Sequence, residues 1–434
     1  MRKLYMMCFY ESNVRYFHFA ESKFAAKGIE LVYLCMYPSA VKYCKRHELK
    51  YKFLPLEVRN KGVIGLVDFK SNVEEDSKFH NFLLPSLKSD FEKLFRMYSS
   101  YYNVIFNDDN CLGAVLIGDV RLFSSSAKVA AEKYNKKLVY FEPGPFSTMI
   151  FDENGVNKNM TISKVTKQGI FEAEVNQASL EMLYKNNSQR KYYDGNFFAY
   201  FRKVHDVFLS VPPDLLRSKL YPELQTGESL IESIPYLISR VFTKRKNNPK
   251  KEQHNKKFIF FPLQVPCDVQ IIINSPNFGS INEMLSALIN SIPDGFNLVV
   301  REHPMNMGRY GDAFYKLLND KNVILDNEND INELIEKAEL VVVNNSTVGV
   351  EALKTDTSVM ILGDSYYDAC THKYNPMFSL KEQIINAIEN PISRDFKDKY
   401  LTLLYEDYLI KDNYKNLHYD NLELLVKRIS RFYA

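Results

Sequence analysis

One stretch, Glu339–Asp364 (ELVVVNNSTVGVEALKTDTSVMILGD), constrains the fold more than any other part of the chain. Leu340–Val343 is a short β-branched run of the kind that forms a strand buried on both faces. Val348–Leu353 follows as a helical segment, and Ser358–Leu362 is the next apolar run. The order of strand, tight turn, helix and strand predicts a βαβ unit of a parallel sheet.

The turn inside this stretch is polar. Asn344 and Asn345 end the strand, and either Ser346 or Thr347 can cap the helix. A helix that begins just after a parallel strand directs unpaired N–H groups and a positive dipole end above the sheet, where a phosphate is favoured. The turn therefore indicates a phosphate site, and an ordinary capped βαβ unit is the alternative.

Strand and helix patterns also alternate elsewhere, which predicts an α/β fold. In the first part of the chain we expect a helix over Phe79–Tyr102 and strands over Ile29–Met36, Gly62–Phe69, Val104–Phe106, Ala114–Ile117 and Leu138–Phe141. In the second part we expect strands over Phe258–Phe261, Asn297–Arg301 and Val323–Leu325. Helices are expected there over Ser280–Ser291, Tyr310–Asn319, Ile331–Ala338, Glu382–Ile388 and Leu422–Phe432.

At 434 residues the chain is too long for one ordinary core, so two domains are expected. Lys244–Lys257 (KRKNNPKKEQHNKK) is a basic segment of low hydrophobicity that predicts a domain boundary. Its charge suits either a solvated linker or contact with anionic lipid. We expect a first domain over residues 1–245, a second over 246–380, and C-terminal helices over 381–434 that can pack back on the first domain.

Composition narrows the function classes. A net charge of +3 argues against a dedicated nucleic-acid binder. The six cysteines include no C-x-x-C pair, which favours free thiols in a reducing compartment. The N-terminus lacks the apolar core of a signal peptide, and no run approaches the roughly 20 apolar residues of a membrane span. We expect a cytoplasmic protein, with peripheral contact at the inner face of the membrane left open.

Polar residues follow several of the predicted strands, where ligands of parallel sheets bind. In the first domain these residues are Asp119 and Glu142, for which a helix cap and a plain turn are the alternatives. In the second domain the polar residues are Asp268, His303, Ser346 and Thr347, with Glu351 one turn into the following helix. We expect this second set to converge on one edge of the sheet.

The second set suits one phosphate and a sugar. The hydroxyls can bind the phosphate, and His303 can donate to a phosphate oxygen or to a leaving group, unless it is a structural histidine. Glu351 can accept from ribose hydroxyls, and Asp268 can be a nucleophile, a base or a structural acceptor. There is no G-x-G-x-x-G or G-K-[ST] loop, which argues against dinucleotide cofactors and ATP hydrolysis. No D-x-D stands at a strand end, so no metal is expected.

Several segments, in this order, carry a resemblance to a known family. They are Gly118–Arg121 (GDVR), Tyr140–Asn157 (YFEPGPFSTMIFDENGVN), Phe261–Ile271 (FPLQVPCDVQI), and the REHP and NNSTVGVEAL blocks that contain His303 and Ser346. Together they resemble the bacterial capsule polysaccharide synthesis family, which includes β-Kdo transferases of GT-B fold. The last two blocks are also similar to the motifs by which several sialyltransferases hold CMP.

The resemblance implies a GT-B protein with two Rossmann-like domains and the active site in the cleft between them. It implies a retaining glycosyltransferase that moves a 2-keto-3-deoxy acid, Kdo or a nonulosonic acid such as pseudaminic acid, from a CMP-activated donor to a glycan or glycolipid acceptor. No cofactor beyond the CMP-sugar substrate is implied, and capsule assembly proteins are candidate partners.

The resemblance also assigns roles to residues. Asp268 would be the nucleophile, with Glu142 or Asp119 of the facing domain as the base. The residues assigned to CMP are Gln264, His303, Asn345, Ser346, Thr347 and Glu351, and those assigned to the sugar or acceptor are Arg121, Asn157 and Arg301. Pro266 and Cys267 depart from relatives that have acidic residues there. A nucleotide-sugar epimerase and a non-catalytic nucleotide-sugar-binding subunit of capsule assembly are the alternative functions.

Overall fold

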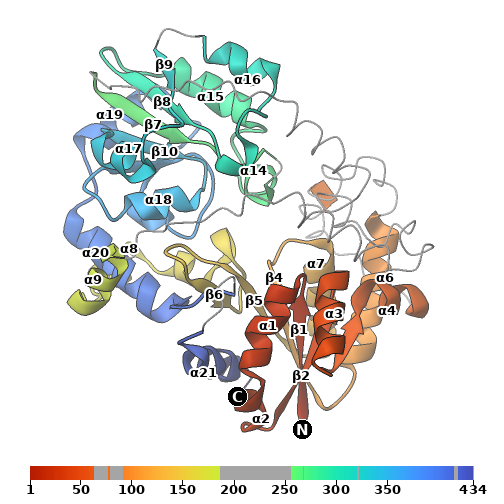
Figure 1. The fold of residues 1–434 in the computed structure, drawn as a ribbon. Coiled ribbons are helices and arrows are strands. Elements are labelled where there is room, and N and C mark those ends of the chain that lie inside the picture. Colours follow the sequence, from red (N-terminus) through yellow and green to blue (C-terminus); the bar gives the residue numbers. More distant parts are fainter. Residues whose placement is uncertain are drawn as a thin grey trace. The chain divides into compact units, whose positions relative to one another are not determined.

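The computed structural model describes residues 1–62, 77–78, 91–185, 256–266, 268–319, 322–414 and 419–433. These residues form two compact units (Figure 1). The first contains the described residues of Met1–Val156 together with Leu409–Ala434, and the second those of Asn157–Tyr192 and Ser239–Tyr408. Each unit has a mainly parallel sheet and helices, so the predicted α/β class with two Rossmann-like domains is confirmed. The predicted cleft between the domains stays a prediction.

The sheet of the first unit has the strand order β13-β6-β5-β4-β1-β2-β3. Its five strands from β5 to β3 run parallel, and β6 and β13 are antiparallel additions at one edge. The strands are β1 (Arg2–Cys8), β2 (Ile29–Cys35), β3 (Tyr51–Phe53), β4 (Cys111–Ile117), β5 (Lys137–Pro143), β6 (Met149–Asp152) and β13 (Leu409–Ile410). Strand β1 lies inside the sheet, between β2 and β4, and is buried over most of its length.

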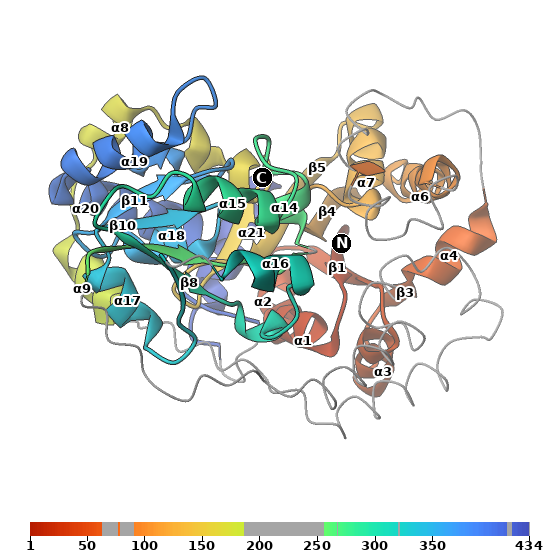
Figure 2. The same ribbon diagram turned by 90° about the horizontal axis from the view of Figure 1, so that it is seen from above.

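Helices flank this sheet. They are α1 (Glu11–Phe19), α2 (Glu21–Ala25), α3 (Pro38–Arg46), α4 (Leu54–Lys61), α6 (Phe91–Phe106), α7 (Leu122–Lys133) and α21 (Leu422–Phe432). Helix α1 contacts α3, and α6 contacts α7, as Figure 2 shows from above. The C-terminal helix α21 contacts β5 and α2.

The predicted strand over Val104–Phe106 is wrong, because these residues end helix α6. Tyr98, Tyr102 and Ile105 are buried at helical spacing, so the apolar stripe of the helix continues through this run. A run of three apolar residues carries too little periodicity to separate a strand from a helix end.

The sheet of the second unit has the order β12-β11-β10-β7-β8-β9, with all strands parallel. The strands are β7 (Phe258–Pro262), β8 (Asn297–Arg301), β9 (Val323–Leu325), β10 (Leu340–Val343), β11 (Ser358–Ile361) and β12 (His372–Lys373). The predicted strands over Phe258–Phe261, Asn297–Arg301, Val323–Leu325 and Leu340–Val343 are confirmed.

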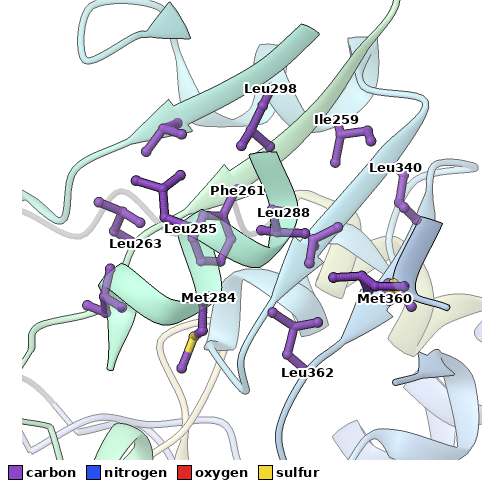
Figure 3. Packing of buried hydrophobic residues seen from close by; sticks show 14 of the residues in the cluster. Ile259, Phe261, Leu263, Met284, Leu285, Leu288, Leu298, Leu340, Met360 and Leu362 are labelled. Carbon is purple, nitrogen blue, oxygen red and sulfur yellow. The ribbon is translucent and has the colours of Figure 1, made fainter. Parts of the chain in front are cut away.

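The described part of the second unit also contains helices. They are α8 (Lys167–Phe171), α9 (Gln177–Lys185), α14 (Val269–Ile272), α15 (Ile281–Ile289), α16 (Asp312–Leu317), α17 (Ile331–Lys337), α18 (Thr347–Ala352), α19 (Leu380–Glu389) and α20 (Arg394–Leu403). Short turns of 3-10 helix span Asn157–Asn159, Thr161–Lys164, Pro304–Asn306 and Asp368–Cys370, and a π-helical turn spans Leu404–Tyr408. Helices α15, α16 and α19 supply apolar side chains to one face. Figure 3 shows Leu285 and Leu288 of α15 against Phe261 and Leu298 of the strands. Helix α18 contacts β10, β11 and α17.

The division into units differs from the predicted boundary at residue 245, because α8 and α9 belong to the second unit. Hydrogen bonds to α20 and to the π-helical turn hold them there. The Lys399 ammonium donates to the Phe171 carbonyl at 2.9 Å, and the Ser179 hydroxyl donates to Glu406 at 2.7 Å. The predicted linker Lys244–Lys257 lies outside the described residues except for its last two.

The last residues of the chain, Leu409–Ala434, belong to the first unit. Strand β13 pairs with β6, and the buried Tyr433 hydroxyl donates to the Ala114 carbonyl at 2.8 Å. Other predictions fall outside the described residues, namely most of the Gly62–Phe69 strand and the start of the Phe79–Tyr102 helix. The described cysteines, Cys8, Cys35, Cys44, Cys111 and Cys370, are buried free thiols. Among the described residues, no helix combines the length and the apolar character that crossing a membrane requires.

Candidate functional site

Three neighbouring strands of the second unit end at the same edge of the sheet. Strands β10, β7 and β8 lie side by side and parallel, so the residues after each strand emerge together. Asn345 follows β10, Gln264 follows β7 and His303 follows β8. The structure therefore brings together three residues that the sequence assigned to CMP. We refer to this edge as the donor rim, after the role that the sequence predicts for it.

Gln264 and Asn345 join two loops of the donor rim through their side chains. The Gln264 Nε2 donates to Asn345 Oδ1 at 3.0 Å, and the Asn345 backbone N–H donates to Gln264 Oε1 at 3.4 Å. Asn345 is 6% exposed, and its Nδ2 donates to the carbonyls of Gln270 and Asn274, both at 3.0 Å. These amides are used within the protein, where they hold the loops together, and their contact with CMP stays a prediction.

Tyr310 links the His303 loop to the Gln264 loop. Its hydroxyl accepts from the His303 backbone N–H at 2.9 Å and donates to the Gln264 carbonyl at 3.1 Å. Burial raises the pKa of Tyr310, so the hydroxyl keeps its proton and remains a donor at neutral pH. No motif in the sequence indicates this role, because Tyr310 was only the first residue of a predicted helix.

Glu302 fixes the backbone that carries His303. It is 3% exposed, and its carboxylate accepts from the Tyr315 hydroxyl at 2.5 Å, the Asn327 amide at 2.8 Å and the Gly308 N–H at 3.1 Å. These three donors satisfy the buried carboxylate within the protein, so Glu302 holds the loop that carries His303. Sequence reasoning missed Glu302, although it lies in the REHP block.

Ser346, one of the two capping residues that the sequence offered, is the N-cap of α18. Its Oγ accepts from the Val348 N–H at 3.3 Å, and its side chain is partly exposed. Thr347 is the first residue of α18, and Glu351 lies one turn further on. Both are also partly exposed, so the three side chains border solvent at the donor rim.

Asp268 is the N-cap of α14, with Oδ1 accepting from the Gln270 N–H at 3.0 Å. This is the structural role that the sequence left open as an alternative to nucleophile. The carbonyl of Gln270 accepts from Asn345, which connects Asp268 to the donor rim. A role of Asp268 in the reaction stays a prediction.

Arg301, which the sequence assigned to the sugar or acceptor, ends β8 and is directed toward the loop before α17. Its guanidinium donates to the Asn329 carbonyl. Burial lowers the pKa of Arg301, and the negative charge of Asp326, in the same loop, partly offsets this effect. The structure thus gives Arg301 a scaffolding contact beside the rim.

A second rim lies at the carboxyl ends of β4 and β5 in the first unit. Gly118 follows β4 with φ of 64°, and a methyl group at its Cα would lie 3.0 Å from Glu142 Oε1. Glycine therefore suits both the backbone conformation and the close approach of this carboxylate. Asp119 and Arg121 follow in the same turn. The Arg121 guanidinium lies over the Phe9 ring, 5.5 Å from its centroid.

Tyr414, which sequence reasoning missed, joins this second rim from the C-terminal segment. Burial and, to a smaller extent, the charge of Glu142 raise the pKa of Tyr414 to about 12, which indicates that the phenol lies near that carboxylate. A hydrogen bond with Asn13 and the positive charge of Arg121 lower the pKa of Tyr414 by smaller amounts. Asn157, the remaining predicted acceptor residue, begins a 3-10 turn with φ of 57° and belongs to the second unit.

The fold and these two rims define a two-domain α/β protein with polar residues gathered at the carboxyl edge of each sheet. A sequence model of the family described as capsule polysaccharide biosynthesis protein matches residues 114–372. The match covers more than half of the chain, so the protein belongs to the capsule polysaccharide biosynthesis family. The family resemblance predicted from the sequence is confirmed.

Individual relatives are more distant. Protein FixF of Sinorhizobium fredii (strain NBRC 101917 / NGR234) is 26% identical over 233 residues, which are 52% of this chain and 56% of FixF. The chain thus spans about half the length of this relative. The β-Kdo 2,7 transferase of Thermosulfurimonas dismutans KpsC is 15% identical with a TM-score of 0.39, covering 77% of this chain and 89% of that chain. Its β-Kdo 2,4 transferase is 11% identical with a TM-score of 0.40, covering 75% and 88%. These TM-scores are too low to bear on substrate.

Proposed function

We propose that this protein is a glycosyltransferase of capsule polysaccharide biosynthesis. It transfers a 2-keto-3-deoxy ulosonic acid, Kdo or a nonulosonic acid such as pseudaminic acid, from a CMP-activated donor to a capsule or surface-glycan acceptor. The observation that carries the proposal is the donor rim. There the Tyr310 hydroxyl joins the His303 and Gln264 backbones, and the Gln264 and Asn345 side chains bond to each other next to Ser346. Membership of the family supports the reaction class.

In this proposal the donor rim binds CMP through its single phosphate. The hydroxyls of Ser346 and Thr347 and the His303 imidazole are the donors for that phosphate, and Glu351 accepts from the ribose hydroxyls. Three neutral or cationic donors match a phosphodiester without a bridging metal, so we expect activity in EDTA. The reaction would take place in the cytoplasm, at the inner face of the membrane for a glycolipid acceptor.

The proposed chemistry is a double displacement. An Asp268 carboxylate oxygen attacks the anomeric carbon, the bond from that carbon to the CMP phosphate oxygen breaks, and CMP departs with the electron pair. The acceptor hydroxyl then attacks the same carbon, its proton passes to Glu142 or Asp119, and the Asp268 ester bond breaks. Two inversions retain the configuration of the donor.

A ligand screen tests the donor class. We expect CMP to raise the melting temperature more than UDP or GDP, because a ligand that binds only the folded state stabilises it. Ser346→Ala and His303→Ala should each weaken CMP binding, since a hydrogen bond to a charged group contributes about 1.5–3 kcal/mol. Unchanged CMP affinity in both variants contradicts this placement. Stabilisation by UDP-sugars, with turnover that needs no acceptor, would support an epimerase instead.

Asp268→Asn tests the mechanism cleanly, because Asn caps helices about as well as Asp. The α14 cap should therefore survive while the nucleophile is lost. We expect unchanged melting temperature and CMP binding, with transfer reduced by several orders of magnitude. CMP-Kdo is β-linked, so a β-linked product from that donor agrees with retention. An α-linked product would indicate a single inversion, with Asp119 or Glu142 as the base.

A further inference from the structure

A buried tyrosine, Tyr367, makes a hydrogen bond to the backbone of the turn that carries Ser346. The Tyr367 hydroxyl donates to the Ser346 carbonyl at 2.5 Å. The same Ser346 carbonyl also accepts from the Gly349 N–H at 2.9 Å, within the first turn of α18. Tyr367 therefore bonds to the backbone of the capping residue itself, 21 positions earlier in the chain.

The Tyr367 ring also fills the space beside Gly349. A methyl group built on Gly349 would lie 2.6 Å from the Tyr367 hydroxyl oxygen and 2.9 Å from its Cε2 and Cζ atoms. Such distances are far below van der Waals contact, so only glycine lets the ring approach α18 this closely. Gly349 is in the helical region and has no positive φ, which means that its role here is the close approach.

Tyr367 is itself firmly fixed. Its side chain is fully buried, and burial raises its pKa, so the hydroxyl keeps its proton. The preceding carbonyl, of Tyr366, accepts from the buried Tyr400 hydroxyl at 2.9 Å. On the other side, Asp368 accepts from the Ser365 N–H at 2.9 Å and binds the Lys373 ammonium at 2.6 Å. A rigid segment thus presents the hydroxyl to Ser346.

We propose that Tyr367 is a positioning residue of the donor rim, which fixes the Ser346–Gly349 turn so that the Ser346 and Thr347 hydroxyls are in place for the donor phosphate. The inference rests on the proposed function, because it assumes that CMP binds at this turn. Tyr367 acts through the backbone and does not itself touch the donor. Pre-organisation of this kind lowers the entropic cost of binding.

Tyr367→Phe removes only the hydroxyl, and Tyr433→Phe is a matched control. Both tyrosines are buried and each donates to one backbone carbonyl, but Tyr433 bonds to Ala114 in the first unit, whereas Tyr367 bonds to the Ser346 turn. We expect both variants to lose melting temperature to a similar extent. Only Tyr367→Phe should weaken CMP binding, by about 3- to 10-fold, the range for loss of one hydrogen bond. The donor KM should rise by the same factor while the KM of the acceptor stays unchanged.

Gly349→Ala provides a second, independent perturbation, because the new methyl group displaces the Tyr367 ring. It should weaken CMP binding at least as much as Tyr367→Phe, and the two effects should be less than additive in the double variant because both act on one contact.

Equal CMP affinities for unaltered protein and Tyr367→Phe, or equal losses in Tyr367→Phe and Tyr433→Phe, would overturn this inference and leave the proposed function intact. Absence of CMP binding by the unaltered protein would overturn the proposed function, and this inference with it.

Discussion

The Gln264–Asn345 pair permits a quantitative prediction about the donor rim. Gln264→Met keeps the length of the side chain and removes both of its polar atoms. The Asn345 Oδ1 then loses its 3.0 Å donor and the Asn345 N–H loses its 3.4 Å acceptor. Because Asn345 is only 6% exposed, water has little access to replace these partners.

The expected loss follows from these two bonds. A hydrogen bond contributes about 0.5–1.5 kcal/mol, and the 3.4 Å bond belongs at the weak end of that range. We therefore expect the unfolding free energy of the second unit to fall by about 2 kcal/mol. Amides of β10 that exchange only on opening of this unit should exchange about 30-fold faster, since 1.4 kcal/mol is a factor of ten.

Urea unfolding and hydrogen-exchange mass spectrometry of the peptide that contains β10 measure this loss. Gln383→Met is the control. The Gln383 side-chain amide makes comparable hydrogen bonds to the backbone of Asn375 and Phe378. These partners lie in an exposed loop, where Phe378 is 64% exposed. Water can replace those bonds, so we expect a loss below about 1 kcal/mol. A loss of the same size in both variants, or below about 0.5 kcal/mol in Gln264→Met, would refute the argument that burial of Asn345 determines the effect.

Two further predictions concern stability. Lys397 is buried and donates to the carbonyls of Thr355 and Thr357, and burial lowers its pKa to about 8. In the unfolded chain the pKa of this lysine is the ordinary 10.5, so above about pH 8 the unfolded state binds more protons than the folded state. The unfolding free energy should therefore rise with pH above about 8, by at most about 1.4 kcal/mol per pH unit. Urea unfolding between pH 7.5 and about 9.5 should show this rise in the unaltered protein, and a rise of equal size in Lys397→Met would contradict it. Gly113 lies in β4 with φ of 144°, and a methyl group there would lie 1.9 Å from the Lys137 carbonyl oxygen. Gly113→Ala should therefore lower the melting temperature sharply. Gly295 is the control, because it has φ of 85° but a methyl group there would meet no atom within 4 Å, so Gly295→Ala should cost only about 1–2 kcal/mol of backbone strain. Equal losses of stability in the two variants would refute the steric argument.

The sequence predicted the second sheet better than the first, for a physical reason. Strands β8, β9 and β10 are short β-branched or leucine-rich runs between clear helical patterns, so local preference and burial agree. Strand β1 (RKLYMMC) contains no β-branched residue, although it is an interior strand that pairs with β4 on one side and β2 on the other. The two residues of β13 form a strand only because they pair with β6, which lies far away in the sequence. Pairing of this kind leaves no local pattern.

The positions of candidate site residues were also predictable, because polar residues directly after parallel strands must emerge at one edge of the sheet. What the sequence could not supply is the set of side chains that hold them. Tyr310 reaches Gln264 across 46 positions, and Tyr367 reaches Ser346 across 21. These contacts depend on how the sheet aligns its strands, which motif spacing does not encode.

Neighbouring residues in one motif can have opposite roles, and this limits how far a motif can assign function. Asn345 and Ser346 are adjacent, and the sequence assigned both to CMP. Asn345 turns inward, where its amide joins three other backbone or side-chain groups, while Ser346 caps α18 at the border with solvent. Since buried polar groups must be satisfied within the protein, the inward residue is committed to the scaffold. We therefore expect substitution of Asn345 to act on stability first, and substitution of Ser346 to act on CMP binding.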